Sequence, residues 1–382
     1  MKIEPFQIAI PQSELDDLLR RLRATRWPDE VEGAGWADGV PTAYLRPLVD
    51  HWATAFDWRA HEARLNAQPQ FLTEIDGQQI HFVHVRSPRA DAQPIIMTHG
   101  WPSTAFDFHA VIGPLTDPDA HGAVGAPAFH VVAPSIPGFG FSSPMRTDGW
   151  SIDRVASAWS VLMENLGYAD FIAQGGDFGS VISPALARAV PDAVRGVHLN
   201  ALLNGAGVDR SRPDPLAGLS AADIGAVEET EAWWAQRSAY ARLQGTRPDT
   251  LAYALTDSPA GLLAWIADLE WAVGDDVLPG EVEVEKEELL AAASIYWFTN
   301  TAGTSARIYK EHGDLFGDTP YTATPTAIAS FPRDGTRRAI AERHHNVVRF
   351  TEYDRGGHFA AVQAPDLLVE DLRQFVLDLG ER

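Results

Sequence analysis

The chain has 382 residues, 45% of them hydrophobic, so it can bury the core of a large globular domain. A formal charge of -22 argues against nucleic acid or an anionic membrane as a partner, because both need a basic protein face. The chain contains no cysteine, which excludes disulfides and thiolate metal sites and is consistent with a cytoplasmic location. It has no signal-peptide core and no run of about eighteen apolar residues, so we expect no membrane span.

Residues 1–66 are predicted to form a helical extension that wraps the core. Ser13 can cap a first helix, and a second helix should begin near Tyr44. The first helix carries leucines at helical spacing: Leu15, Leu18, Leu19 and Leu22. The second places Leu48, Trp52 and Phe56 on one face.

Residues 67–202 form the first part of the predicted core, where short apolar runs alternate with helical stretches. This alternation is typical of a mostly parallel sheet covered by helices on both faces. The strands begin with a hairpin that turns at Asp76-Gly77. His81 and His84 should face opposite sides of its second strand, so we interpret both as structural.

Between residues 203 and 318 no clear strand appears, and the helical stretches are rich in aromatic residues. Strand signals return at 326–330 and 346–350, within a second core part that spans 319–382. We therefore predict an α/β fold interrupted by a helical cap. Ligands of open α/β sheets bind beyond the carboxyl ends of the strands, where such a cap would close.

The stretch Gly175-Gly176-Asp177-Phe178-Gly179-Ser180 lies between an apolar run and a predicted helix. Small residues on both sides of one larger residue are typical of the sharp strand-to-helix turn that raises a nucleophile above the sheet. Here the raised residue is Asp177, and no serine has the same glycine spacing. The alternative is a glycine-rich turn whose aspartate caps the following helix.

In such folds a histidine follows the last strand and an acid follows the strand before it. His358, in the turn Gly356-Gly357-His358-Phe359, occupies the first position, and Asp334 occupies the second. Glu352 and Asp354 are rivals for the acid, but they lie close to His358 in sequence. The acid would fix the tautomer of the imidazole and stabilise its charged form.

An oxyanion hole requires two backbone N–H groups, one from the residue after the nucleophile and one from the loop after an earlier strand. These residues are predicted to be Phe178 and Trp101, the latter in His99-Gly100-Trp101-Pro102. His99 itself is interpreted as a structural hydrogen-bonding residue.

Together with Pro137-Gly138-Phe139-Gly140-Phe141-Ser142, these motifs resemble the α/β-hydrolase-fold epoxide hydrolases, and specifically their microsomal-type branch. The helical extension, with Thr25-Arg26-Trp27-Pro28, resembles the N-terminal region of that branch, so the resemblance covers essentially the whole chain. It implies an enzyme that opens an epoxide with water to a vicinal diol, without a metal or other cofactor.

The resemblance also implies roles that spacing alone leaves open. The family uses two cap tyrosines to protonate the epoxide oxygen, and the matching segments contain Tyr240 and Tyr309. Trp101 and Phe178 would join them in binding the substrate. Mammalian members have a membrane anchor that this sequence lacks, so we expect a soluble protein, and they place glutamate where Asp334 stands.

The implied mechanism is covalent: Asp177 attacks the epoxide, and water activated by His358 hydrolyses the ester. Two alternatives remain, a haloalkane dehalogenase with the same Asp-His pair and a non-catalytic binding protein on this scaffold. The aromatic cap favours a bulky or aryl-substituted epoxide. The sequence leaves open a homodimer and a role in detoxification or in natural-product biosynthesis.

Overall fold

The structure is a computed structural model that describes residues 2–33, 35–205, 207–273, 283–313, 319–332 and 334–380, with side chains left out for 270–273 and 283–285. The predicted boundary between the cap and the second core part, at 318 and 319, falls beside residues 314–318, which lie outside the described residues. No helix in the described ranges combines the length and the apolar composition needed to cross a bilayer.

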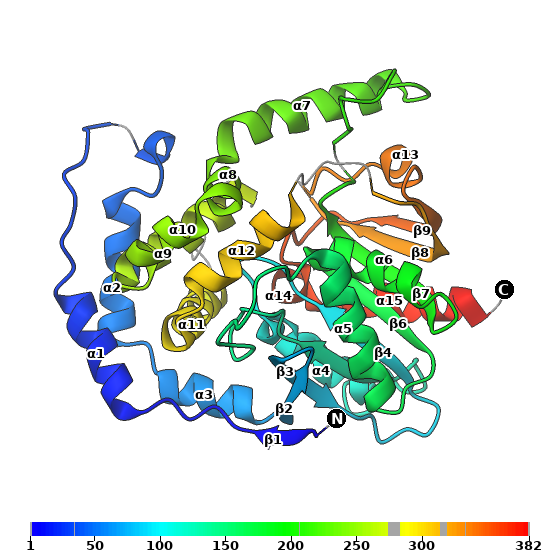
Figure 1. The fold of residues 1–382 in the computed structure, drawn as a ribbon, viewed down its shortest axis with the longest axis horizontal. Helices are drawn as coiled ribbons and strands as arrows, with labels where there is room; N and C mark the ends of the chain where they lie inside the picture. Colours follow the sequence, from blue (N-terminus) through cyan, green and yellow to red (C-terminus); the bar gives the residue numbers. More distant parts are fainter. Residues whose placement is uncertain are drawn as a thin grey trace.

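The centre of the molecule is a nine-stranded sheet in the order β1-β2-β3-β5-β4-β6-β7-β8-β9 (Figure 1). Strands from β4 onward pair in parallel, whereas β3 is antiparallel to both β2 and β5. The strands are β1 (Glu4–Phe6), β2 (Gln70–Ile75), β3 (Gln78–Val85), β4 (Gln93–Thr98), β5 (Phe129–Pro134), β6 (Phe171–Asp177), β7 (Val194–Leu202), β8 (Thr322–Ser330) and β9 (His345–Glu352). This confirms the predicted hairpin and the mostly parallel sheet. It also brings the carboxyl ends of β4 to β9 to one edge.

Helices cover both faces of the sheet, as predicted. The helices α5 (Ile152–Asn165) and α6 (Gly179–Ala189) lie on one face, and α4 (His109–Thr116) and α15 (Pro365–Gly380) lie on the other (Figure 1). Each pair contributes to a separate apolar cluster, with Trp159 and Ile182 in the first and Leu115 and Phe375 in the second. The short helices η2 (Ala105–Phe108), α13 (Arg338–Ala341) and α14 (Ala360–Gln363) lie in connections.

In its described ranges, 207–273 and 283–313, the cap consists of turns as far as Ser220 and of helices with short connections after it, and no strand occurs among these residues. Its helices are α7 (Ala221–Arg237), α8 (Ala239–Thr246), α9 (Pro248–Leu255), α10 (Pro259–Val273), α11 (Glu283–Thr299) and α12 (Ala302–His312).

The N-terminal extension consists of β1, α1 (Gln12–Arg23), η1 (Gly35–Asp38), α2 (Thr42–Thr54) and α3 (Trp58–Asn66), and its helices run along the outside of the cap (Figure 1). The indole Nε1 of Trp52 donates to Ser294 Oγ at 3.0 Å, and Arg64 forms an ion pair with Glu288. The prediction that Ser13 caps α1 is wrong. The helix begins at Gln12 after Pro11, so Ser13 is already inside its first turn.

The turn from β6 into α6 is as tight as its glycines predicted. Asp177 lies at its apex with a φ of 52°, in the left-handed region. A Cβ atom on Gly175 would lie 2.2 Å from the carbonyl oxygen of Gly179, and one on Gly179 would lie 2.0 Å from that of Thr98. The two backbones can approach this closely only because both residues are glycine.

Gly175→Ala should therefore destabilise the protein by about 1–3 kcal/mol or more, because the clash is with backbone that cannot move aside. Gly225→Ala is the matched control, since nothing lies within 4 Å of its added Cβ in the middle of α7. It should leave stability unchanged or raise it by up to ~1 kcal/mol through helix propensity. Thermal unfolding compares the two, and equal stability of both variants would contradict the close approach.

Candidate active site

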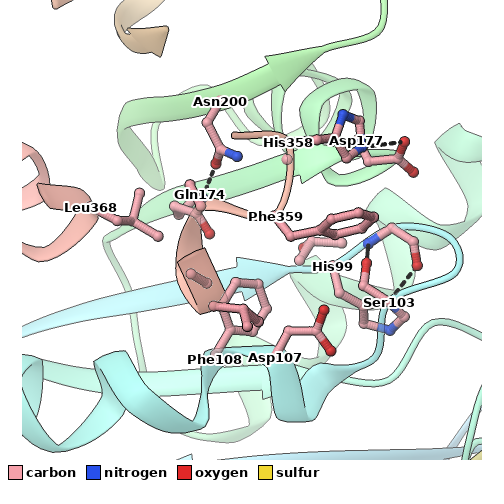
Figure 2. Close-up of a pocket in the computed structure, with 16 residues that line it drawn as sticks. His99, Ser103, Asp107, Phe108, Gln174, Asp177, Asn200, His358, Phe359 and Leu368 are labelled. Atoms are coloured by element: carbon pink, nitrogen blue, oxygen red, sulfur yellow. Dashed lines mark hydrogen bonds and ion pairs between the residues drawn. The ribbon is translucent and has the colours of Figure 1, made fainter. Parts of the chain in front are cut away.

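The carboxylate of Asp177 is held from two directions at the carboxyl edge of the sheet. The backbone N–H of Trp101 donates to Oδ1 at 2.9 Å. Nε2 of His358 lies 3.2 Å from Oδ2 (Figure 2). A Cβ atom on Gly100 would lie 2.2 Å from Oδ1, so the loop after β4 must carry glycine here. Asp177 and His358 are both largely buried, which strengthens their interaction.

His358 reaches Asp177 from the connection that follows β9. Gly356 adopts a φ of 88°, in the left-handed region where glycine is favoured. A Cβ atom on Gly357 would lie 2.8 Å from Oε1 of Gln363, the last residue of α14. The glycine pair therefore lets the chain turn sharply and bring the imidazole back over the sheet.

His99 is a structural residue, as predicted. The N–H of Ile136 donates to its Nε2 at 3.1 Å, so Nδ1 carries the proton and donates to the carbonyl oxygen of Gly100 at 2.9 Å. Burial lowers the pKa of His99 to about 4, which keeps the ring neutral. It stabilises the loop that presents the Trp101 N–H.

Phe178, the other residue predicted for the oxyanion hole, directly follows Asp177. Its ring is fully buried, with its centroid 4.8 Å from that of Tyr309. Among the hydrogen bonds of the described residues, none joins the Phe178 N–H to the Asp177 carboxylate.

Asp334 follows β8, but its carboxylate is bound within its own loop. It accepts hydrogen bonds from the N–H of Thr336 at 2.8 Å, the N–H of Phe331 at 2.9 Å and Ser330 Oγ at 3.2 Å. Burial raises its pKa, and these donors oppose that shift. Within the described ranges no hydrogen bond connects Asp334 with His358. Its rivals, Glu352 and Asp354, are both exposed.

The structure brings together the two tyrosines that only the family resemblance had indicated. Tyr240 on α8 and Tyr309 on α12 form a perpendicular pair with ring centroids 5.8 Å apart. The Tyr309 ring also lies 6.0 Å from that of Trp101. Residues on two cap helices thus meet the loops that hold Asp177.

The phenols lie close enough to Asp177 to feel its charge. Burial raises the pKa of both above the ordinary value of 10.0, and the negative charge of Asp177 raises it further. A third phenol, Tyr296, differs because its hydroxyl donates to the carbonyl oxygen of Ser103 at 3.0 Å. No hydrogen bond from Tyr240 or Tyr309 to a backbone carbonyl occurs among the described residues.

A cavity on the core side of Asp177, with several polar side chains in its wall, was missed in the sequence. Its lining includes Asp107, Gln174 and Asn200, together with Asp177 and His358 (Figure 2). One local signal was present, because Thr104 and Asp107 form a capping box with the spacing typical of helix starts. The second local signal was Gln174, a glutamine inside the apolar strand β6.

The fold and the position of Asp177 define an α/β-hydrolase. The family model "alpha/beta hydrolase fold" matches residues 93–257, and "Epoxide hydrolase N terminus" matches residues 3–108. A relative from Stigmatella aurantiaca is 42% identical over 97% of this chain and 84% of its own length. Sus scrofa "Epoxide hydrolase 1" is 34% identical, covering 98% of this chain and 88% of its own.

The structure of Aspergillus niger epoxide hydrolase superposes with a TM-score of 0.85 at 32% identity, covering 99% of this chain and 97% of that one. The chain therefore belongs to the epoxide hydrolase family, in agreement with the resemblance found in its sequence.

Proposed function

We propose that the protein converts an epoxide to a vicinal diol through a covalent ester on Asp177. The observation that carries the proposal is the Asp177 carboxylate, whose Oδ1 accepts from the Trp101 N–H while Oδ2 faces His358. Two buried phenols from the cap lie near the same carboxylate. This combination supplies a nucleophile, a base and an acid around one position.

In the first half-reaction, Oδ2 of Asp177 attacks an epoxide carbon and the C–O bond of the ring breaks. A phenol O–H of Tyr240 or Tyr309 protonates the departing oxygen. Burial is the larger cause of the raised pKa of both phenols and persists, but Asp177 loses its charge as the ester forms, so its own contribution to that shift disappears. Proton donation thus becomes easier as the carboxylate is consumed.

In the second half-reaction, His358 takes a proton from water and the oxygen attacks the carbonyl carbon of the ester. Negative charge develops on Oδ1, which already accepts from the Trp101 N–H, and the Phe178 N–H is the proposed second donor. Collapse of this intermediate releases the diol and restores the carboxylate. The proton held by His358 returns to the phenolate.

Asp334 is the proposed acid for orienting His358. The position of Asp334 supports this role, because the residue follows β8, the strand that pairs with the final strand β9. The two rival acids, Glu352 and Asp354, are exposed. Its bonds to Ser330, Phe331 and Thr336 hold the carboxylate in a defined orientation.

The alternative of halide release is less well supported. A halide needs N–H donors in the pocket, but the indole N–H of Trp101 already donates to Ser305 Oγ at 3.0 Å. Phe178 has no side-chain donor. The aromatic walls formed by Trp101, Phe178, Tyr240 and Tyr309 favour a bulky or aryl-substituted epoxide instead.

The two half-reactions can be separated with variants of the Asp-His pair. Asp177→Asn should form no ester, because an amide is a poor nucleophile, whereas His358→Gln should form the ester once and then stall. Intact mass spectrometry after incubation with styrene oxide should show His358→Gln heavier by one substrate and Asp177→Asn unchanged. An unmodified His358→Gln protein would contradict this division of roles.

The tyrosine pair is tested by the rate of ester formation. Tyr240→Phe and Tyr309→Phe should each slow it, and the double variant should lose most of the about 10²–10⁴-fold that a positioned acid contributes. Tyr253→Phe, on the exposed face of α9, is the matched control and should react like the wild type. A folded double variant with nearly the wild-type rate would show that another group is the acid.

A further inference from the structure

A cavity with about 390 Å³ of empty space, including its opening to solvent, lies on the core side of the Asp177–His358 pair. Its described lining comes entirely from the hydrolase core: from β4 and the loop after it, η2, β6, β7, the segment around α14, and α15. Trp101, Phe178, Tyr240 and Tyr309, which form the aromatic side of the site, are absent from that lining. Asp177 therefore lies between this cavity on the core side and the aromatic side chains on the cap side.

The cavity wall contains polar atoms that the rest of the described chain leaves unsatisfied. Gln174 is 1% exposed and donates from Nε2 to Asn200 Oδ1 at 3.0 Å, but its Oε1 has no hydrogen-bond partner among the described residues. Thr98 Oγ1 also has no hydrogen-bond partner among the described residues, and Thr98 is likewise 1% exposed. Leaving such groups unpaired costs about 1–3 kcal/mol each, so buried polar atoms of this kind normally bind water.

Asp107 adds a carboxylate to the same wall. Its Oδ1 accepts from the N–H of Thr104 at 2.9 Å and from the hydroxyl of Thr104 at 3.1 Å, which fixes the side chain. Within the described residues Oδ2 takes part in no hydrogen bond. Burial raises the pKa of Asp107 to about 7, and the charge of Glu288 adds to the shift. A carboxyl group of this kind can accept a hydrogen bond from water or donate one to it.

We propose that this cavity supplies the water of the second half-reaction, with Asp107, Gln174 and Thr98 holding it beside His358, so that water and epoxide reach Asp177 from opposite sides. The inference rests on the proposed covalent function. In the step it serves, a held water loses one proton to Nε2 of His358. Its oxygen bonds to Cγ of Asp177, the ester C–O bond breaks, and the second proton of that water passes to the diol oxygen as the carboxylate is restored.

Access of water and of epoxide to Asp177 from separate sides would favour both half-reactions. The first half-reaction needs a dry aromatic pocket in which the phenols and the carboxylate interact strongly. The second needs a water already in place when the ester forms. Asp107, Gln174 and Thr98 are thus positioning residues for water, with no part in ester formation.

Two variants test the proposal independently of each other. Asp107→Asn keeps the shape of the side chain, and Thr98→Val replaces one hydroxyl with a methyl group of similar shape. Single-turnover experiments with styrene oxide would follow ester formation and ester breakdown by quenching and intact mass spectrometry. Ester formation should proceed at the wild-type rate, and breakdown should slow by about tenfold or more, within the ~10²-fold that a misplaced reactant costs.

Steady-state kinetics provide a readout that a general loss of stability would not produce. If only ester breakdown is slowed, kcat and KM should fall together and kcat/KM should stay unchanged. Thr116→Val is the matched control: this buried hydroxyl bonds to the carbonyl oxygen of Ile112, away from the cavity, and neither step should change.

Wild-type ester breakdown in both Asp107→Asn and Thr98→Val would overturn the proposal, and so would an equal slowing of both steps. A wild-type protein that forms no ester would instead overturn the covalent function. The wild-type experiment alone reveals whether an ester forms, so failure of the covalent function can be distinguished from failure of the water proposal.

Discussion

The geometry of the site depends on one constraint, the left-handed backbone conformation of Asp177 at the tight turn between β6 and α6. Glycines at 175 and 179 permit this turn, because Gly175 lies against the backbone of Gly179 at the start of α6 and Gly179 lies against the backbone of Thr98 at the end of β4. The carboxylate is thereby raised to meet the Trp101 N–H on one oxygen and His358 on the other. The constraint costs conformational freedom, and it holds the carboxylate of Asp177, the proposed nucleophile, in one orientation.

The negative charge of Asp177, a core residue, affects the pKa of two tyrosines of the cap. Burial raises the pKa of Tyr240 and Tyr309, and this charge raises it further, so both phenols are protonated and able to donate in the proposed first half-reaction. The N-terminal extension contacts another helix of the same cap, α11, where Ser294 accepts the hydrogen bond from Trp52. The extension thus lies on the outside of the molecule and packs against the cap that carries the two tyrosines proposed as the acid (Figure 1).

Local patterns in the sequence were sufficient for most of the fold, because the strands are short apolar runs and the turn at Asp177 has a distinctive glycine spacing. Elements without such a pattern were missed: β1 has only three residues, and it is specified by its pairing with β2. The tyrosine pair came from family resemblance alone, since cap helices meet through tertiary packing. Asp107 and Gln174 were missed for the same reason, being 67 positions apart in sequence and joined only by the cavity they line.

The central claim is that the oxygen delivered to the epoxide comes first from Asp177 and only afterwards from water. A single turnover with enzyme in excess, run in oxygen-18 water, tests it directly. The covalent route predicts label in the peptide that contains Asp177 and none in the first diol released, because water restores the carboxylate after the ester has formed. Label in the diol alone, with an unlabelled Asp177 peptide, would show that water attacks the epoxide directly and would contradict the account.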